Sequence, residues 1–160
     1  MSLFPLRMLP RLRPVAARDY FCRNRAWTWF SQAIIGIIPF DRVLTGVRQD
    51  PLAEIDAALE RGEIVIIFPE GTRGEPEQLE RLRTGVAHIA ARHPDVPFVP
   101  ICLHGLGKAL PRGEALLVPF IVDVFIGEVV TWMGQRATFM EQLECRMTDL
   151  IEEGHFEPWE

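Results

Sequence analysis

Short runs of continuously apolar residues alternate along the chain with longer stretches in which apolar residues recur every three or four positions. The runs at 64–68 and 98–103 contain almost no polar residue, which is typical of strands buried on both faces of a sheet. Weaker runs at 15–21 and 36–42 predict two more strands, and residues 116–127 predict one or two others. We therefore expect a sheet made largely of buried strands.

Stretches with helical periodicity lie between these runs. Asp50 is a good helix cap and Pro51 suits the first helical turn, so a helix is predicted to begin there. Gly62 is the stop signal of this helix. A second helix is predicted over residues 76–93, where apolar residues again form one face. That face consists of Leu79, Leu82, Val86 and Ile89.

Two further helices are predicted toward the ends of the chain. Residues 25–35 are apolar over much of the helical circumference, which indicates a helix that is buried or contacts an apolar partner. Near the C-terminus, Thr138 and Glu141 form a capping-box pattern at the start of an amphipathic stretch. Its apolar face consists of Met140, Leu143, Met147, Leu150 and Ile151.

Strands that alternate with helices indicate an α/β layered domain, in which helices flank a central sheet of mostly parallel or mixed strands. A chain of 160 residues is long enough for one such domain with a sizeable core. We assign residues 15–153 to this domain and residues 154–160 to a tail. Residues 1–14 form a basic and apolar N-terminal segment, whose prolines prevent one regular helix, and we expect poor order there.

The charges are unevenly distributed. Residues 1–48 carry eight arginines and two acidic residues, whereas the remainder is acidic enough to bring the formal net charge to −5. An arginine-rich and leucine-rich start is suited to an anionic membrane surface, the alternative being a poorly ordered terminus. The acidic balance and the single lysine argue against nucleic-acid binding. No apolar run approaches the roughly 18 residues of a membrane span.

Several familiar kinds of site are excluded by their spacing. The three cysteines lie far apart, which favours reduced thiols in a cytosolic compartment. The cysteines and four histidines show no metal-ligand spacing, so no metal is expected. The GLGK sequence at 105–108 begins like a dinucleotide loop, but Leu110 replaces the third glycine and Pro111 prevents a helix from starting.

The most informative stretch is the apolar run 64–68, which leads directly into PEGTR at 69–73. Proline cannot donate to a sheet ladder, and Gly71 is able to adopt positive φ or to let another group approach its backbone. Thr72 and Arg73 add a hydroxyl and a planar set of donors suited to a phosphate or carboxylate. The alternative is an ordinary strand-to-helix turn that ends in a solvated arginine.

Three segments together resemble a known family: GIIPFDR at 36–42, FPEGTR at 68–73 and VPICL at 99–103. Their order and separations resemble the second, third and fourth sequence blocks of the glycerophospholipid acyltransferases, the lysophosphatidic acid acyltransferase family. The RTG sequence at 83–85 fits as well, and the likeness covers roughly residues 14–130. The FPEGTR block is highly specific, whereas the other two alone would be weak.

The resemblance implies roles for five residues of the second and third blocks. Arg42 and Arg73 would hold the phosphate of the acyl acceptor, and Gly71 and Thr72 would shape the pocket. Glu70 would orient the glycerol part of the acceptor or brace an arginine, because a carboxylate repels phosphate. A rigid strand exit that presents forked donors is physically suited to this task.

The implied reaction resembles that of 1-acylglycerol-3-phosphate O-acyltransferases. An acyl group would pass from acyl-CoA or acyl-carrier protein to a free hydroxyl of a lysophospholipid or glycerol phosphate, with no further cofactor. Gly85, Val99 and Pro100 would line the acyl or thioester path, with plain core as the alternative for Val99 and Pro100. Because the acceptor resides in a bilayer, the resemblance implies a cytoplasmic protein that is peripheral to the inner face of the membrane.

One block of the family pattern is missing. In the family, a His-x-x-x-x-Asp block supplies a histidine as general base on the acceptor hydroxyl and an aspartate that orients it. The first histidine of this chain is His88, and no histidine is followed by aspartate at that spacing. We therefore expect no catalytic residue here, as in an N-terminally truncated acyltransferase domain with almost no activity by itself. The alternative is a non-catalytic relative that binds phospholipid, phosphate or a partner.

Overall fold

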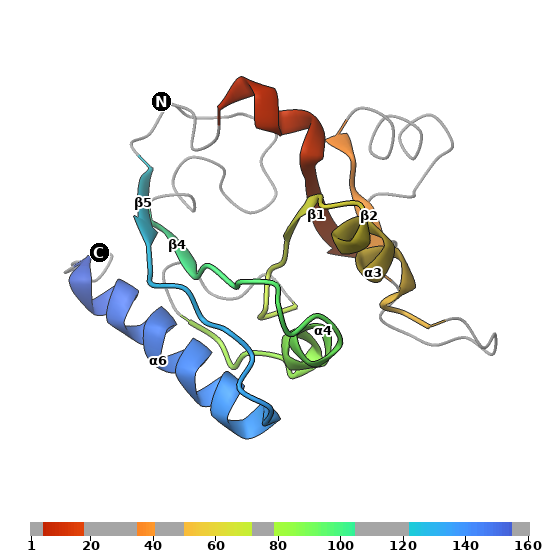
Figure 1. Cartoon of the computed structure of the whole chain (residues 1–160). Helices are drawn as coiled ribbons and strands as arrows, with labels where there is room; N and C mark the ends of the chain where they lie inside the picture. The colour runs from red at the N-terminus through yellow and green to blue at the C-terminus, as the bar shows by residue number, and fades with distance from the viewer. Residues whose placement is uncertain (1–4, 18–34, 41–49, 72–78, 105–121, 155–160) are drawn as a thin grey trace. The chain divides into compact units, whose positions relative to one another are not determined.

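The computed structural model describes residues 5–17, 35–40, 50–71, 79–104 and 122–154. The chain divides into two compact units, Met1–Phe68 and Pro69–Glu160 (Figure 1). The first contains a parallel sheet and the second an antiparallel strand pair, each with a helix packed on it. The predicted α/β class with parallel or mixed strands is therefore confirmed.

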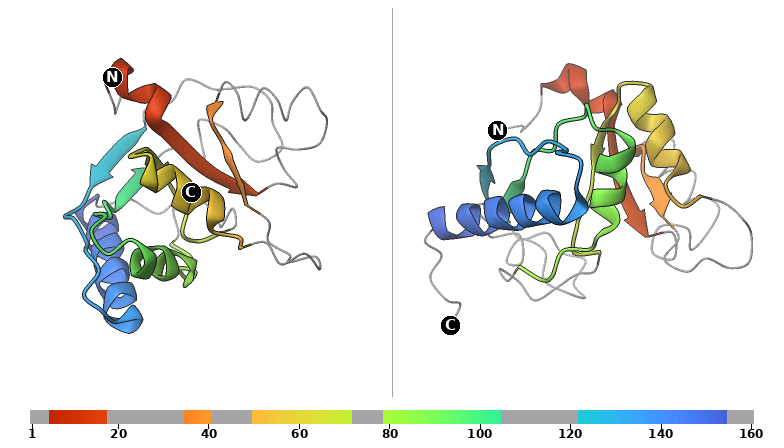
Figure 2. Two further views of the ribbon diagram at one scale, coloured as in Figure 1. Left: turned by 45° about the vertical axis from the view of Figure 1, so that its right-hand side comes forward. Right: turned by 60° about the horizontal axis from the view of Figure 1, so that its bottom comes forward.

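The first unit is built on a three-stranded sheet in the order β2-β1-β3, in which both strand pairs are parallel. Its elements are the 3₁₀ helix η1 (Leu6–Arg11), β1 (Leu12–Ala17), β2 (Ile38–Phe40), α3 (Ala53–Glu60) and β3 (Ile64–Ile66). Helix α3 packs against β3 and buries Ile55 and Ala58, which belong to the core of this unit (Figures 1 and 2). A parallel sheet with a helix on its face is the layered arrangement that the alternation of elements predicted.

The central strand β1 pairs with different neighbours along its length. Leu12–Pro14 are in register with Ile64–Ile66 of β3, whereas Val15–Ala17 are in register with Ile38–Phe40 of β2. Proline cannot donate to a ladder and is usually confined to edge strands. Pro14 is the last residue of β1 that pairs with β3, and the next residue pairs with β2. Its missing N–H therefore lies at the end of a ladder and not in the middle of one.

The N-terminal boundary that we predicted is wrong. We expected the first strand at 15–21 and poor order before it, but β1 begins at Leu12 and follows η1 without a break. The physical reason is a long-range pairing that the local pattern does not show, because Leu12 pairs with Ile64 and the side chain of Arg13 pairs with Glu63. Residues 18–21 lie outside the described residues.

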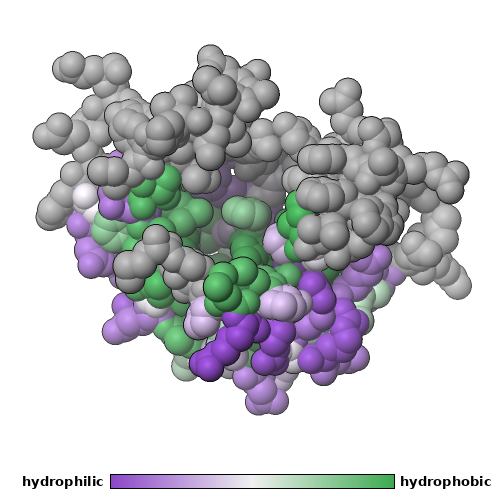
Figure 3. Space-filling model, turned by 90° about the horizontal axis from the view of Figure 1, so that it is seen from above, coloured by the Kyte–Doolittle hydropathy of each residue, from purple (hydrophilic) through white to green (hydrophobic). Residues whose placement is uncertain are grey.

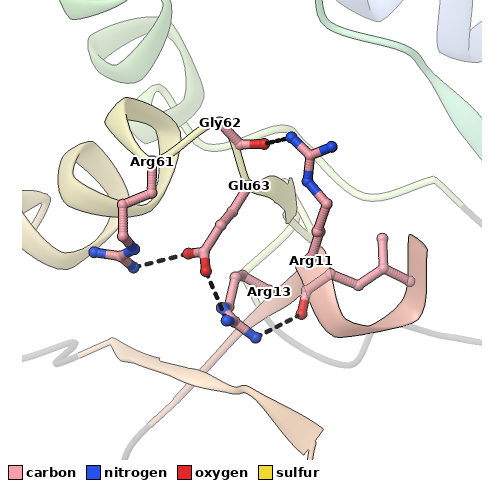
Figure 4. Close-up of polar contacts among 6 residues, drawn as sticks. Arg11, Arg13, Arg61, Gly62 and Glu63 are labelled. Carbon is pink, nitrogen blue, oxygen red and sulfur yellow. Dashed lines mark hydrogen bonds and ion pairs between the residues drawn. The ribbon is translucent and has the colours of Figure 1, made fainter. Parts of the chain in front are cut away.

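Glu63 connects the start of β3 to β1 and to the end of α3 (Figure 4). Its two carboxylate oxygens lie 2.6 Å from Nη2 of Arg13 and 2.8 Å from Nη2 of Arg61. Arg11 donates to the carbonyl oxygen of the neighbouring Gly62. The Glu63 side chain is only 13% exposed, and the hydrogen bonds from Arg13 and then Arg61 hold its pKa below the usual value of 4.5.

Two glycines leave room for the arginine side chains around Glu63. Gly36 has φ of +76°, and a Cβ added there would collide with the guanidinium of Arg13. Gly62 has φ of +69° and ends α3, as the stop signal predicted. The predicted start of this helix is too early, since α3 begins at Ala53 rather than at Pro51. Asp50 Oδ1 accepts a hydrogen bond of 3.0 Å from the Leu52 N–H in the turn that precedes the helix.

The second unit pairs an antiparallel β4–β5 ribbon with two helices. Its elements are α4 (Gly85–Arg92), β4 (Ile101–His104), β5 (Asp123–Ile126) and α6 (Arg136–Glu153). Helix α6 packs against both α4 and β4 (Figure 2). The ring of Phe139 is fully buried at the centre of the core and meets the ring of Phe98 edge-on, with 5.1 Å between the centroids. The rest of the core cluster is Leu82, Val86, Ala87, Ala90, Val130 and Leu143.

Two predicted helix starts in this unit are wrong. The helix predicted from residue 76 begins only at Gly85, and the described residues 79–83 before it are not helical. The main-chain N–H of Arg83 bonds to the carbonyl of Pro69 instead of to a preceding helical turn. Helix α6 begins at Arg136, which places the predicted capping residue Thr138 inside the helix.

The remaining predicted elements agree in part with the structure where it describes them. The strand predicted at 98–103 is confirmed in part as β4, which begins only at Ile101. Its predicted burial on both faces is wrong, because Val99 and Leu103 are exposed. Phe98 and Val130 continue the pairing through two N–H to carbonyl bonds of 2.9 and 2.8 Å. β5 lies within the predicted 116–127 segment, of which residues 116–121 lie outside the described residues. The helix predicted at 25–35 also lies outside them, apart from Ile35.

Glu63→Gln is expected to destabilise the protein at neutral pH. A carboxyl with a lowered folded pKa contributes stability above its unfolded pKa and loses that contribution as pH falls through the folded value. The difference in free energy of unfolding between wild type and variant should therefore shrink in acid. Urea denaturation across that pH range measures it, with the exposed Glu60→Gln as matched control. An equal difference at every pH would contradict the electrostatic role of Glu63.

Candidate anion-binding site

The candidate site is centred on the Pro69–Gly71 turn, which opens the second unit. Gly71 has φ of +70°, the left-handed conformation that its place in the sequence predicted. The chain then continues into Thr72 and Arg73, whose side chains carry the chemistry proposed for this motif. Both residues lie outside the described residues, as does Arg42, so the predicted convergence of Arg42 and Arg73 on one phosphate stays a prediction.

Residues 80–83 hold this turn in place. The main-chain N–H of Arg83 donates to the carbonyl of Pro69 at 2.8 Å, and its side-chain Nε lies 3.4 Å from the carbonyl oxygen of Glu70. The main-chain N–H of Glu80 donates to the Glu70 carboxylate. The loop that carries Thr72 and Arg73 therefore starts and ends at two segments that are bonded to each other.

Gly71 also lets the Arg83 side chain lie close against the turn. A Cβ added at Gly71 would lie 3.3 Å from Cγ of Arg83, closer than ordinary van der Waals contact. A larger residue would have to displace this side chain and would be strained by the positive φ as well. The glycine of the motif thus serves both the conformation of the turn and the approach of Arg83.

The pKa of Glu70 is raised above its usual value. Burial is the main cause, and the nearby Glu80 carboxylate adds to it, while the hydrogen bond from the Glu80 N–H opposes the shift. A carboxyl in this setting is suited to accept a hydrogen bond from a hydroxyl or guanidinium. When ionised it would repel a phosphate, and the role assigned to it from the sequence stays a prediction.

The residues predicted to line an acyl path lie on two elements. Gly85 is the first residue of α4, and nothing would contact a Cβ added there. Val99 is 47% exposed and Pro100 is buried, with its carbonyl accepting the Gly127 N–H at 2.9 Å. These positions neither confirm nor contradict a path, so the assignment stays a prediction.

Val99 lies in line with an aliphatic face of the β4–β5 ribbon. Alternate residues of a strand share a face, and directly paired residues of neighbouring strands do so too. Leu103 pairs with Val124 and Ile101 pairs with Ile126, so these four share one face of the ribbon. Three of them, Leu103, Val124 and Ile126, are exposed large apolar residues. Figure 3 shows how apolar and hydrophilic residues are distributed over one side of the described molecule.

Sequence reasoning missed the two residues that anchor the turn. Arg83 entered it only as part of the RTG sequence, and Glu80 was placed inside a predicted helix. Their contacts join positions that are 10 to 14 residues apart and depend on residues 79–83 being non-helical. The only signal in the sequence was the RTG match after the FPEGTR block.

Two other kinds of feature are absent from the described residues. None of the helices in these ranges is both long and apolar enough to cross a membrane. Within the same ranges, no three histidine, cysteine, aspartate or glutamate residues are grouped as metal ligands would be.

The layered α/β fold and the anchored Pro-Glu-Gly turn are those of an acyltransferase-type domain. The family model described as Acyltransferase matches residues 2–104, and the chain belongs to this family. The match includes the 36–42 and 68–73 segments and all of β1 to β4, so it confirms the resemblance first recognised from the three sequence blocks.

Curated relatives and a solved structure agree with this membership. Chloroplastic 1-acyl-sn-glycerol-3-phosphate acyltransferases of Brassica napus and Arabidopsis thaliana are 34% and 33% identical to the chain over 85 residues. Those residues are 53% of this chain but only 24% of each relative. The crystal structure of the 1-acyl-sn-glycerophosphate (LPA) acyltransferase PlsC of Thermotoga maritima shares the fold, with a TM-score of 0.72 and 21% identity over 94% of this chain and 59% of that one.

Glu70→Gln is expected to stabilise the protein at neutral pH. A carboxyl whose folded pKa is raised favours folding below its unfolded pKa and costs stability as pH rises through the folded value. Glutamine keeps an oxygen for the Glu80 N–H but never ionises. The gain in free energy of unfolding should appear at neutral pH and fade in acid, when denaturation is followed against pH. The exposed Glu141→Gln serves as control, and a variant less stable than wild type at neutral pH would refute the burial argument.

Proposed function

We propose that the chain is the acceptor-binding part of a glycerophospholipid acyltransferase. It would bind a lysophospholipid or glycerol phosphate by its phosphate, while an acyl group passes to the acceptor hydroxyl from acyl-CoA or acyl-carrier protein. The observation that carries the proposal is the Pro69–Gly71 turn, bonded to residues 80–83, inside the FPEGTR motif of an acyltransferase family member. The named activity of the relatives, acyl transfer to 1-acyl-sn-glycerol-3-phosphate, supports the same acceptor class.

The chemistry of the phosphate explains the choice of residues. A phosphate needs forked donors in a fixed position, and an arginine guanidinium supplies a planar pair of N–H groups. Arg73 follows the anchored turn after one residue in the sequence. In this proposal Arg42 supplies a second guanidinium, Gly71 and Thr72 shape the pocket, and Glu70 accepts a hydrogen bond from a glycerol hydroxyl or an arginine.

The acyl chain needs an apolar surface. The exposed aliphatic face of β4 and β5, in line with Val99, has that character. We assign Val99, Pro100 and Gly85 to the acyl or thioester path on this basis. An acceptor that resides in a bilayer also requires a surface that docks on the membrane. We assign this surface to the arginine-rich and leucine-rich start of the chain, at the inner face of a cytoplasmic membrane.

Transfer itself requires a general base, since the acceptor hydroxyl must lose its proton as it attacks the thioester carbonyl and the thiol leaves. The family pattern places this task on a His-x-x-x-x-Asp block, which the 160-residue sequence does not contain. The same observation favours a second candidate function, a non-catalytic relative that binds lipid phosphates or a partner. Supplying the missing block in trans or by fusion would restore turnover only under the first candidate.

Arg73→Lys is expected to weaken phosphate binding although the net charge is unchanged. Lysine keeps the charge and loses the planar fork. A hydrogen bond to a charged group contributes about 1.5–3 kcal/mol, which corresponds to a roughly ten- to hundredfold loss of affinity per contact. Calorimetric titration with glycerol 3-phosphate measures it, and Arg136→Lys on α6 is the matched control. Equal affinities of wild type and Arg73→Lys would remove Arg73 from the pocket.

The 160-residue chain is expected to transfer acyl groups at a rate near background. The loss of general-base catalysis typically costs about 10²–10⁴-fold in rate, and poorer positioning of the hydroxyl adds to it. The assay supplies acyl-CoA or acyl-carrier protein together with lysophosphatidate and follows release of the free thiol. Turnover at ordinary enzymatic rates would contradict this expectation, and substitution of His104 and His155 would then identify the base.

A further inference from the structure

Arg83 contacts the Pro69–Gly71 turn through both its main chain and its side chain. Its N–H bonds to Pro69 O, its Nε lies 3.4 Å from Glu70 O, and its Cγ lies where a side chain at Gly71 would be. The side chain is exposed, and its two terminal nitrogens make no ion pair with another described residue. A guanidinium is therefore placed beside the anion-binding motif with most of its donors unused by the described part of the fold.

We propose that Arg83 is a further ligand of the acceptor's phosphate, in addition to Arg73. This inference rests on the proposed function, because it adds a binding residue to the same pocket. Arginine has five N–H donors in a fixed fork, and the contact with Glu70 O uses only the Nε donor. The donors on the two terminal nitrogens are left to grip a phosphate from the side of the turn.

Two carboxylates lie at the turn that the Arg83 side chain contacts. Glu70 and Glu80 lie close enough for their carboxylates to interact unfavourably, and both would repel an incoming phosphate. Arg83 is the positive group that directly contacts this turn. Binding of an anion here requires a charge that offsets the two carboxylates, and the side chain of Arg83 supplies it at the required place.

A purely structural role for this side chain is a weak alternative. The strong anchor of the turn is the 2.8 Å bond from the Arg83 main chain, which any residue except proline would make. The side-chain contact is long at 3.4 Å and exposed, so it contributes little to stability. An uncharged residue with the same reach would hold the turn equally well, and this separates the two roles experimentally.

The test compares Arg83→Ala, Arg83→Gln and Arg83→Lys with wild type in calorimetric titrations with glycerol 3-phosphate and with inorganic phosphate. Arg83→Ala and Arg83→Gln should each lower affinity by about tenfold, the low end expected for one exposed charged contact. Arg83→Lys should lose less, because it keeps the charge. Arg81→Ala is the matched control, since Arg81 is an exposed arginine two residues away that has no described contact with the turn.

The possible outcomes distinguish a failure of this inference from a failure of the proposed function. If wild type binds neither probe, both the proposed function and this inference are wrong. If wild type binds and Arg73→Lys is weakened while Arg83→Gln binds like wild type, the site stands and Arg83 is not a ligand. A loss of affinity in Arg81→Ala equal to that in Arg83→Ala would also overturn the inference, since general charge would then explain both. Thermal unfolding checks that each variant is folded. If Arg83→Ala is unfolded, the affinities of Arg83→Gln and Arg83→Lys for the two probes decide whether Arg83 is a ligand.

Discussion

The hydrogen bond from the Arg83 N–H to the carbonyl of Pro69 is the constraint on which the candidate site depends. It fixes the end of the FPEGTR turn and withdraws Arg83 from helical hydrogen bonding, so that α4 starts only at Gly85. It also brings the backbone of residues 80–83 beside Glu70, which accounts for the burial and the raised pKa of that carboxyl. One main-chain bond thus determines the shape, the electrostatics and the neighbouring element of the site.

Glu63 connects elements of the first unit as the Arg83–Pro69 bond connects segments of the second, but it does so through ion pairs. The Glu63 carboxylate binds Arg13 of β1 and Arg61 at the end of α3, and so links β1 and α3 to the start of β3. A partly buried carboxylate would be costly without such partners, and the two guanidinium groups remove that cost. The pKa shifts of Glu63 and Glu70 have opposite signs because the first carboxylate meets arginines, whereas the second is partly buried and lies near another carboxylate.

Sequence reasoning succeeded where the signal was local. The helix between Asp50 and Gly62, part of the strand at 98–103 and the left-handed Gly71 follow from capping, apolar runs and backbone conformation, and all are observed. It failed where contacts between residues far apart in the sequence determine the local structure. Leu12 joins the sheet through Ile64, and residues 79–83 leave the helical pattern to bond a turn more than ten positions earlier, although their apolar spacing is helical. The family likeness covered the motif and the RTG sequence, but it gave no supporting role to Arg83 or Glu80.

The raised pKa of Glu70 has a consequence for any phosphate that binds beside it. Added negative charge would disfavour the ionised carboxyl further, so phosphate binding and proton uptake by Glu70 would favour each other. A protonated carboxyl does not repel the phosphate and gains an O–H donor. A positive charge at position 83 would favour the bound phosphate without any change in the protonation of Glu70. If Arg83 is a ligand as proposed, its charge and the protonation of Glu70, rather than the arginine of the motif alone, would together affect the pH range over which such a pocket accepts an anion.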